Sequence, residues 1–152
     1  MPPDLSPLIS AIRAYLDAAL YSDTPSLRAL AAALDGLATA YNLAPEGDVT
    51  DTEADAPSTD AVAIGRMVSE RFPTFGFYAL ANPLNPLQDT PLCGDAVDDA
   101  EEIASDLMEV VWLWENVGPD DAHWQFRWGY ENHWGEHLRD LQRYLYAHLF
   151  RT

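Results

Sequence analysis

Apolar side chains recur at steps of three and four residues along most of the chain, which is the spacing of one face of an α-helix. The first such pattern follows Ser6 and Pro7, where a capping serine and a proline at the first helical position mark a helix start. A second pattern follows Thr24 and Pro25 and continues to Tyr41. Because only a short segment separates the two patterns, we expect an antiparallel helical hairpin.

Three further helices are predicted in the rest of the chain. Their expected limits are Ser58 or Thr59 to Arg71, Asp95 to Gly118, and Asp120 or Asp121 to about Phe150. The last helix contains Gly129 and Gly135, and because glycine weakens a helix interior we expect a bend or break near one of them. Strand patterns are rare, so the sequence predicts an all-α bundle of about five helices in one domain, residues 1–152.

The expected core of this bundle follows from the same spacing. Ile103 and Leu107 belong to one apolar stripe of the fourth helix, and Val62 is available for the core from the third. Trp134 is expected to face the core from the last helix. The acidic residues of the fourth helix are expected on its opposite side or in its first turns, and they are Asp99, Glu101, Glu102, Asp106 and Glu109.

Two segments lack a helical pattern. Residues 44–60 are rich in aspartate, threonine and proline and are predicted to form a flexible acidic loop. Asp51, Glu53 and Asp55 alternate there like the first ligands of a calcium loop, but the sequence lacks the later glycine and glutamate of that motif. Residues 73–94 contain several prolines and are expected to form an ordered irregular arm in preference to a strand.

The charge of the chain is strongly negative, with 25 acidic residues against 8 basic ones and a formal net charge of −17. All of the basic residues are arginine. This charge repels nucleic acid and anionic membrane surfaces, so direct binding to either is not expected. A basic protein partner fits the charge if the acidic surface mimics nucleic acid, whereas a solvated surface that serves only solubility requires no partner.

The cysteine content and the start of the sequence bear on location. Cys93 is the only cysteine, so no intramolecular disulfide forms, which fits a reducing compartment. The first residues lack the basic and apolar regions of a signal peptide, and no apolar run is long enough to cross a bilayer. We therefore expect a soluble cytoplasmic protein.

The segment "ENHWGEH", which begins at Glu131, contains the spacing H-x-x-E-H of one class of zinc peptidases. On one continuous helix, His133 and His137 would be metal ligands on adjacent turns, with zinc or iron as the metal, and Glu136 would be the base that activates water. Against this interpretation, Asp140 is the only carboxylate after the motif, and the chain is small for such a peptidase. The alternative is that both histidines are polar residues at the border of an aromatic helix and that no cofactor binds.

A second candidate site lies along the same helix, where polar side chains share the half that carries the apolar stripe. These residues are His123, Arg127, Tyr130, Glu131, Trp134 and His137. A mixture of aromatic and converging polar groups is typical of a small-molecule pocket. Alternatively, Arg127 and Glu131 pair across one helical turn, and the face is structural.

The C-terminal third of the chain has a tryptophan-rich helix, then Trp-Gly, then a leucine-rich helix with a histidine near its end. The residues that form this pattern are Trp124, Phe126, Tyr130, Trp134, Gly135, Leu138, Leu141 and His148. In this pattern the chain resembles a family of small bacterial proteins catalogued only as a domain of unknown function. The resemblance implies an α-helical bundle and no known activity, and it makes Gly135 an architectural residue at a helix bend.

Three interpretations of the function follow. The first is a non-catalytic interaction or accessory module with a protein partner, able to form a homodimer through an aromatic surface. The second is a metal-binding protein or metal-dependent hydrolase that uses His133 and His137. The third is an acidic mimic that occupies a basic partner. The sequence gives no support for an enzyme apart from the one motif, so the first, non-catalytic interpretation is favoured.

Overall fold

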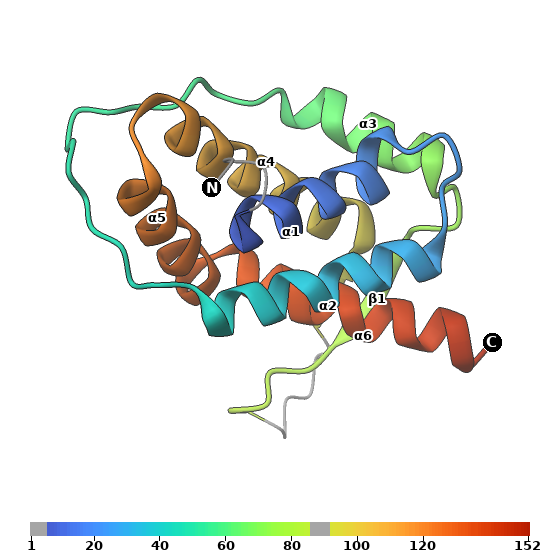
Figure 1. Ribbon diagram of the computed structural model, residues 1–152. Helices are drawn as coiled ribbons and strands as arrows, with labels where there is room; N and C mark the ends of the chain where they lie inside the picture. Colours follow the sequence, from blue (N-terminus) through green and yellow to red (C-terminus); the bar gives the residue numbers. More distant parts are fainter. Residues whose placement is uncertain (1–5, 86–91) are drawn as a thin grey trace.

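Helices packed around α4 form most of the protein, and a small hairpin lies at one end (Figure 1). The computed structural model describes residues 6–85 and 92–152, and this part of the chain contains six α-helices and two β-strands. Their limits are α1 (Pro7–Leu16), α2 (Leu27–Leu43), α3 (Ala61–Arg71), β1 (Phe77–Leu80), β2 (Leu92–Asp95), α4 (Ala96–Asn116), α5 (Pro119–Asn132) and α6 (Trp134–Phe150). The predicted helical character is confirmed, but the class is not purely α because a two-stranded sheet is present.

Side-chain hydrogen bonds cap the starts of α2, α3 and α4, whereas α1 has a proline at its first position and no such bond from Ser6. Helix α1 begins after Ser6, as predicted. Helix α2 begins later than expected, because the Ser26 side chain accepts a hydrogen bond from the backbone N–H of Ala29 and so fixes the first turn there. Asp60 caps α3 in place of the serine or threonine just before it, and Asp95 caps α4 as predicted.

Helix α1 ends in a π-helical turn, η2 (Asp17–Tyr21). Backbone carbonyls at a helix end lack partners within the helix and need other donors. The Arg71 side chain, in the last turn of α3, provides them: Nε, Nη1 and Nη2 donate to the carbonyl oxygens of Ala19, Ser22 and Ala18 at 3.0, 2.6 and 3.4 Å. One guanidinium group therefore joins the end of α1 to α3.

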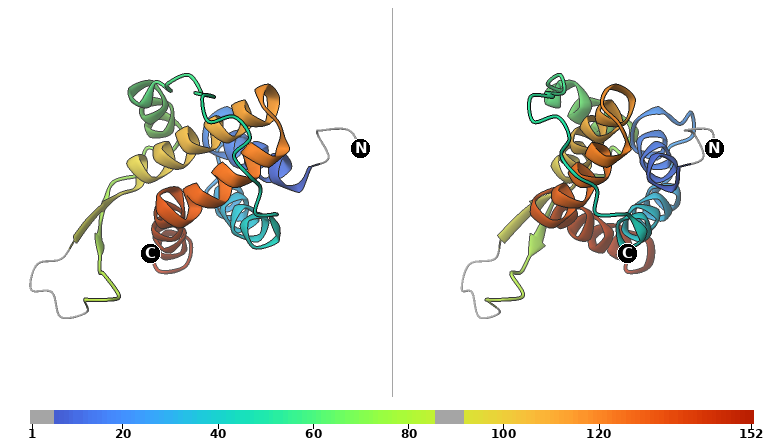
Figure 2. Two further views of the ribbon diagram at one scale, coloured as in Figure 1. Left: turned by 90° about the vertical axis from the view of Figure 1, so that its left-hand side faces the viewer. Right: turned by 60° about the vertical axis from the view of Figure 1, so that its left-hand side comes forward.

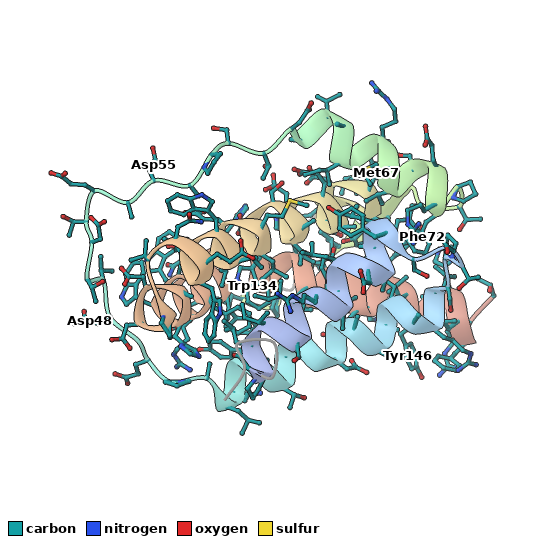
Figure 3. The ribbon with its side chains drawn as sticks, turned by 45° about the horizontal axis from the view of Figure 1, so that its top comes forward. Asp48, Asp55, Met67, Phe72, Trp134 and Tyr146 are labelled. Atoms are coloured by element: carbon teal, nitrogen blue, oxygen red, sulfur yellow. The ribbon has the colours of Figure 1, made fainter. Side chains whose placement is uncertain are left out.

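Helix α4 brings the predicted apolar stripe into the centre of the core. Ile103 is fully buried, and α1, α3, α5 and α6 all pack against this helix. Trp134, at the start of α6, is also fully buried and lies in the middle of the bundle in Figure 3. Val62 was predicted to contribute to the core but is 72% exposed, because Ile64 and Val68 form the buried face of the short helix α3.

The predicted last helix is in fact two helices, α5 and α6, which are separated at His133. This residue has φ −149° and ψ −80°, outside the helical region. After the break, the backbone of α6 approaches α5 so closely that a Cβ atom at Gly135 would lie 2.1 Å from the carbonyl oxygen of Tyr130. Only glycine fits this contact, and the bend or break expected near Gly129 or Gly135 is a complete break at His133.

Part of the predicted irregular arm is a β-hairpin, so this prediction is wrong for the strand residues. Strands β1 and β2 pair antiparallel with Tyr78 opposite Gly94, and Figure 2 shows the hairpin extending away from the helices. The Tyr78 ring lies over Gly94, where a Cβ atom would be 2.3 Å from Cζ of the ring. This ring contact requires a glycine and favours the pairing. The remaining part of the arm, residues 86–91, lies outside the described residues.

The acidic loop, residues 44–60, follows the outside of α5 (Figure 1). Asp121, a buried residue of α5, accepts hydrogen bonds from the backbone N–H of Thr50 at 2.9 Å and from its hydroxyl at 2.5 Å. These bonds, first of all the one from the Thr50 hydroxyl, lower the pKa of the Asp121 carboxyl group. The backbone N–H of Asp48 donates to the carbonyl oxygen of Asp120 at 3.1 Å. The segment predicted to be flexible therefore has fixed contacts in its middle.

Candidate metal centre

A row of carboxylates on α4 faces the junction between α5 and α6. Asp99, Glu102 and Asp106 are three and four residues apart, so they lie on one face of the helix. Asp99 lies in the first turn of α4, as predicted, but it is only 4% exposed; Glu101, beyond the first turn, is also buried, so the expectation of an opposite, solvated side is wrong for it. All three carboxylates lie within 4 Å of a histidine of the junction. The match between the acidic spacing on α4 and the spacing of the histidines is a pattern that sequence reasoning missed.

His133 lies in the junction itself, between the last residue of α5 and the first residue of α6. Its Nδ1 lies 2.6 Å from Oδ2 of Asp106, and its Nε2 lies 3.4 Å from Oε2 of Glu102. An ionised carboxylate only accepts hydrogen bonds, so the Nδ1–H group donates to Asp106. In the neutral ring, Nε2 is then left with a lone pair beside the Glu102 carboxylate.

His137, in the first turn of α6, is anchored in the same way. Its Nδ1 donates to Oδ1 of Asp99 at 2.8 Å, and the Tyr78 hydroxyl of β1 donates to Oδ2 of the same carboxylate. The hydrogen bond to Asp99 raises the pKa of the His137 imidazole, although burial acts in the opposite direction. Burial, followed by the bond to Asp99, raises the pKa of the Tyr78 hydroxyl. Asp99 therefore links the hairpin to the helix junction.

The two imidazole rings and the Glu102 carboxylate come together at this junction. The rings of His133 and His137 meet edge to face with their centroids 5.2 Å apart. One ligand atom from each of the three residues lies within 4.8 Å of the other two. In a tetrahedral zinc site with metal–ligand distances of about 2.0 Å, the ligand atoms are about 3.3 Å apart. The 3.4 Å between His133 Nε2 and Glu102 Oε2 is close to this separation.

The aspartates behind the histidines complete the arrangement that metal sites usually have. A histidine that binds a metal through one nitrogen commonly donates its other N–H to a carboxylate, which fixes the ring and increases its basicity. Asp106 and Asp99 occupy this position for His133 and His137. Two histidines and one glutamate are the ligands of several catalytic zinc sites and also of non-haem iron(II) sites. Three protein ligands leave a coordination position open for water or a small ligand.

Glu136 was predicted to be the base of the H-x-x-E-H motif, but it is outside the cluster of ligand atoms among the described residues. Because the helix breaks at His133, the motif does not lie on one continuous helix, which corrects the sequence expectation. Glu136 is exposed and lines a separate cavity beside the hairpin, together with Arg139 and Asp140. Burial, and then the nearby carboxylates of Asp99 and Glu136, raise the pKa of the Asp140 carboxyl group.

The six residues predicted to line one pocket lie in different parts of the described structure. His123 lines an apolar cavity near the start of α1, and Arg127 and Glu131 line a polar cavity beside the acidic loop. The Tyr130 ring stacks on Tyr41 of α2, and Trp134 is buried in the core. His137 belongs to the metal centre. The break at His133 ends the continuous helical face on which this prediction depended. Within the described residues no ion pair joins Arg127 to Glu131, and Arg127 Nη1 donates instead to the carbonyl oxygens of Tyr41 and Ala44.

Comparison of the chain with protein-family models, with curated proteins and with solved structures gives no match. The resemblance to a bacterial family of unknown function therefore stays an expectation. None of the helices in the described residues combines the length and the apolar character needed to cross a membrane. The geometry of the candidate site is therefore the basis on which a function is proposed.

Proposed function

We propose that the protein binds one divalent transition metal ion, zinc or iron(II), through His133, His137 and Glu102. The observation that carries this proposal is a pair of histidines whose Nδ1 atoms are each held by an aspartate, beside a third carboxylate. Because Nδ1 is engaged in both rings, Nε2 is the nitrogen that each ring offers to a metal. Both histidines belong to the sequence motif, and Glu102 is the third ligand that the motif alone did not provide.

The charge around the ligands supports the binding of a cation. Asp99 and Asp106 lie directly behind the two imidazole rings, and the whole chain has a formal net charge of −17. Carboxylates that lie close together repel one another, and a divalent cation offsets this repulsion. Because the ligands come from α4, from the junction and from α6, metal binding also stabilises the packing of these elements.

An accessory role fits this site better than peptidase activity. Glu136, the residue that would act as the base, lines another cavity. The side chain of His133 is 42% exposed, so the centre lies at the surface and not inside a deep substrate cleft. We therefore propose metal binding in a cytoplasmic accessory protein, and we assign no reaction to the open coordination position.

Elemental analysis of tag-free protein purified without chelator tests the proposal. We expect about one equivalent of zinc or iron per chain, and background metal in the His133→Ala, His137→Ala double variant. The matched control is the His123→Ala, His148→Ala double variant, which removes the other two histidines and keeps the cluster intact. Titration of the metal-free protein with Zn²⁺, and with Fe²⁺ under anaerobic conditions, identifies the preferred ion.

A Glu102→Gln variant tests the role of the third ligand. The amide keeps the shape of the side chain but removes its charge, so we expect the Kd for the metal to increase at least about ten-fold. Background metal in the wild-type protein, combined with no saturable binding of either ion, would overturn the proposal. Equal metal content in the two histidine double variants would overturn it as well.

A further inference from the structure

A cavity of about 400 Å³ lies between the acidic loop and α5 and shares no residue with the metal centre. Its walls combine the indole rings of Trp124 and Trp128 with the carboxylates of Glu46, Asp48 and Glu131. Asp48, one of the lining residues, is labelled in Figure 3 on the loop that runs beside α5. Trp128 is 47% exposed, although the large apolar surface of tryptophan is usually well buried. Much of the surface of this indole ring is therefore open to solvent on the cavity side of α5.

The loop wall of the cavity is fixed by close contacts with α5. Gly47 has φ +72°, and a Cβ atom there would lie 2.4 Å from the carbonyl oxygen of Asp120 and 2.5 Å from the backbone nitrogen of Trp124. The hydrogen bonds from Thr50 to Asp121 hold the loop a few residues further on. A wall that is already ordered loses little conformational freedom when a ligand binds.

The balance of charge in the cavity is negative. Three carboxylates line it together with one cationic side chain, Arg127. The Arg127 guanidinium lies 4.8 Å from the centre of the Tyr41 ring and donates from Nη1 to the carbonyl oxygens of Tyr41 and Ala44, at 3.2 Å each. It is therefore engaged by the end of α2. Among the ion pairs of the described residues, none involves the three carboxylates of the cavity.

We propose that this cavity binds an organic cation, meaning an alkylated ammonium or a guanidinium group. Trp124 and Trp128 are stacked almost in parallel, with an angle of 13° and centroids 6.1 Å apart, and a cation is attracted to the face of an indole ring. The carboxylates provide the opposite charge. The bound state of an ammonium or guanidinium group with an apolar periphery is stabilised by both the indole rings and the carboxylates. A small inorganic cation keeps its water shell, so contact with indole stabilises it little.

Two sources provide the same chemistry. One is a free small molecule with a quaternary ammonium or guanidinium group, and the other is a lysine or arginine side chain of a basic protein. The formal net charge of −17 attracts either of them over long distances at low ionic strength. The proposal does not depend on metal binding, because the two sites share no residue.

The indole N–H signals of the five tryptophans provide a direct test by NMR. The protein is titrated with tetramethylammonium chloride, and sodium chloride at the same ionic strength is the reference. We expect saturable shifts of the Trp124 and Trp128 signals with the organic cation only. The shifts should be lost in Trp128→Leu and retained in the matched control Trp112→Leu, which removes a tryptophan of α4 outside the cavity.

A Glu131→Gln variant keeps the test decisive even if the tryptophan variant folds poorly. It leaves both indole rings in place and removes one charge, so we expect the Kd for tetramethylammonium to increase about ten-fold. A lysine-rich peptide that binds at least about ten-fold more tightly than the free ion identifies a basic protein as the source of the ligand. A peptide that binds no more tightly identifies a small molecule. Shifts that do not saturate, or that sodium chloride reproduces, would overturn the proposal.

Discussion

The backbone around Gly135 leaves no space for a side chain. A Cβ atom would meet the carbonyl oxygen and the ring of Tyr130, and a backbone oxygen cannot move without disturbing α5. Gly36 of α2 is the opposite case, because nothing lies within 4 Å of an added Cβ atom. The two glycines therefore form a matched pair for one substitution.

We expect Gly135→Ala to lower the free energy of unfolding by about 2–3 kcal/mol through overpacking. Gly36→Ala should raise it by about 0.5–1 kcal/mol, because alanine favours a helix interior more than glycine does. Urea denaturation followed by circular dichroism measures both values. Similar changes in the two variants would contradict the close contact at Gly135.

His137 gives stability a pH dependence whose sign depends on the metal. In the metal-free protein the hydrogen bond to Asp99 raises the pKa of the folded state above the unfolded value of 6.5. The pair therefore stabilises the fold fully below that value, and this stabilisation is lost as the pH rises through the folded pKa. A bound metal requires the neutral imidazole, so stabilisation by the metal increases with pH.

Melting temperatures between about pH 6 and pH 8 test this reversal. The contribution of His137 to stability is the difference in melting temperature between wild type and His137→Gln. This difference should decrease as the pH rises in the presence of chelator, and it should increase with pH at saturating zinc. The His148→Gln variant is the control and should show neither trend. The same slope for His137 in both conditions would be inconsistent with a metal at this residue.

The site residues that could be predicted from the sequence are those marked by a short motif. The spacing of His133 and His137 and the glycine after Trp134 are visible within seven residues. Glu102 and the two aspartates could not be assigned in this way, because their role depends on how α4 packs against the α5–α6 junction. That packing is a tertiary property that periodicity alone does not contain.

At the scale of the elements, Arg71 donates hydrogen bonds to the backbone carbonyl oxygens that lack a partner at the end of α1. Its planar group donates to three carbonyl oxygens at once, and the ammonium group of lysine does not match this geometry. We expect Arg71→Lys to lower the free energy of unfolding by about 1–3 kcal/mol. Arg66→Lys, an exposed change on the same helix, should have almost no effect in the same urea titration. Equal values would show that charge alone matters at position 71.

The hairpin is coupled to the metal centre through one carboxylate. In Tyr78→Phe, Asp99 loses the donor from β1 and holds His137 less firmly. We expect the Kd for the metal to increase about ten-fold, within the range observed for groups that support a metal ligand. Tyr21→Phe removes an exposed hydroxyl of η2 and serves as the control. Calorimetric titration measures the Kd for the metal in both variants. An unchanged Kd in Tyr78→Phe would mean that the hairpin does not influence metal binding.

Helices were predictable here and the hairpin was not, for a physical reason. Each helix has its period of 3.6 residues, and a capping side chain marks the starts of α2, α3 and α4. The Tyr78 ring packs over Gly94 across the strand pair, a contact between residues far apart in the sequence, and the segment between the strands offers no tight-turn motif. Prolines at 73 and 83 then suggested irregular structure, although neither lies within a strand.

At the scale of the whole molecule, the acidic charge is largely uncompensated. In the described part of the chain, all ion pairs within 4 Å use histidine. Arginine side chains lie instead over aromatic rings, as Arg127 does over Tyr41 and Arg143 over Tyr146. Repulsion between carboxylates therefore opposes the folded state, and dissolved salt screens it.

We expect the melting temperature of the metal-free protein to increase as sodium chloride is raised from about 0.01 M to about 0.3 M, where the Debye length falls from about 30 Å to less than 10 Å. Differential scanning calorimetry in the presence of chelator measures this change. Sodium sulfate at equal ionic strength shows how much of the effect is preferential exclusion and how much is screening. A melting temperature that is constant or falls with sodium chloride would mean that the arginines compensate the charge after all.

The exposed thiol of Cys93 has a practical consequence. It lies on β2, next to the glycine beneath the Tyr78 ring, and it is the only cysteine of the chain. A maleimide spin label or fluorophore therefore attaches at one position without any engineered substitution. Because the chain also lacks lysine, amine-reactive labels have no side chain to modify. Two-colour experiments on this protein can thus place one label on the hairpin through the native thiol and the second at a newly introduced lysine.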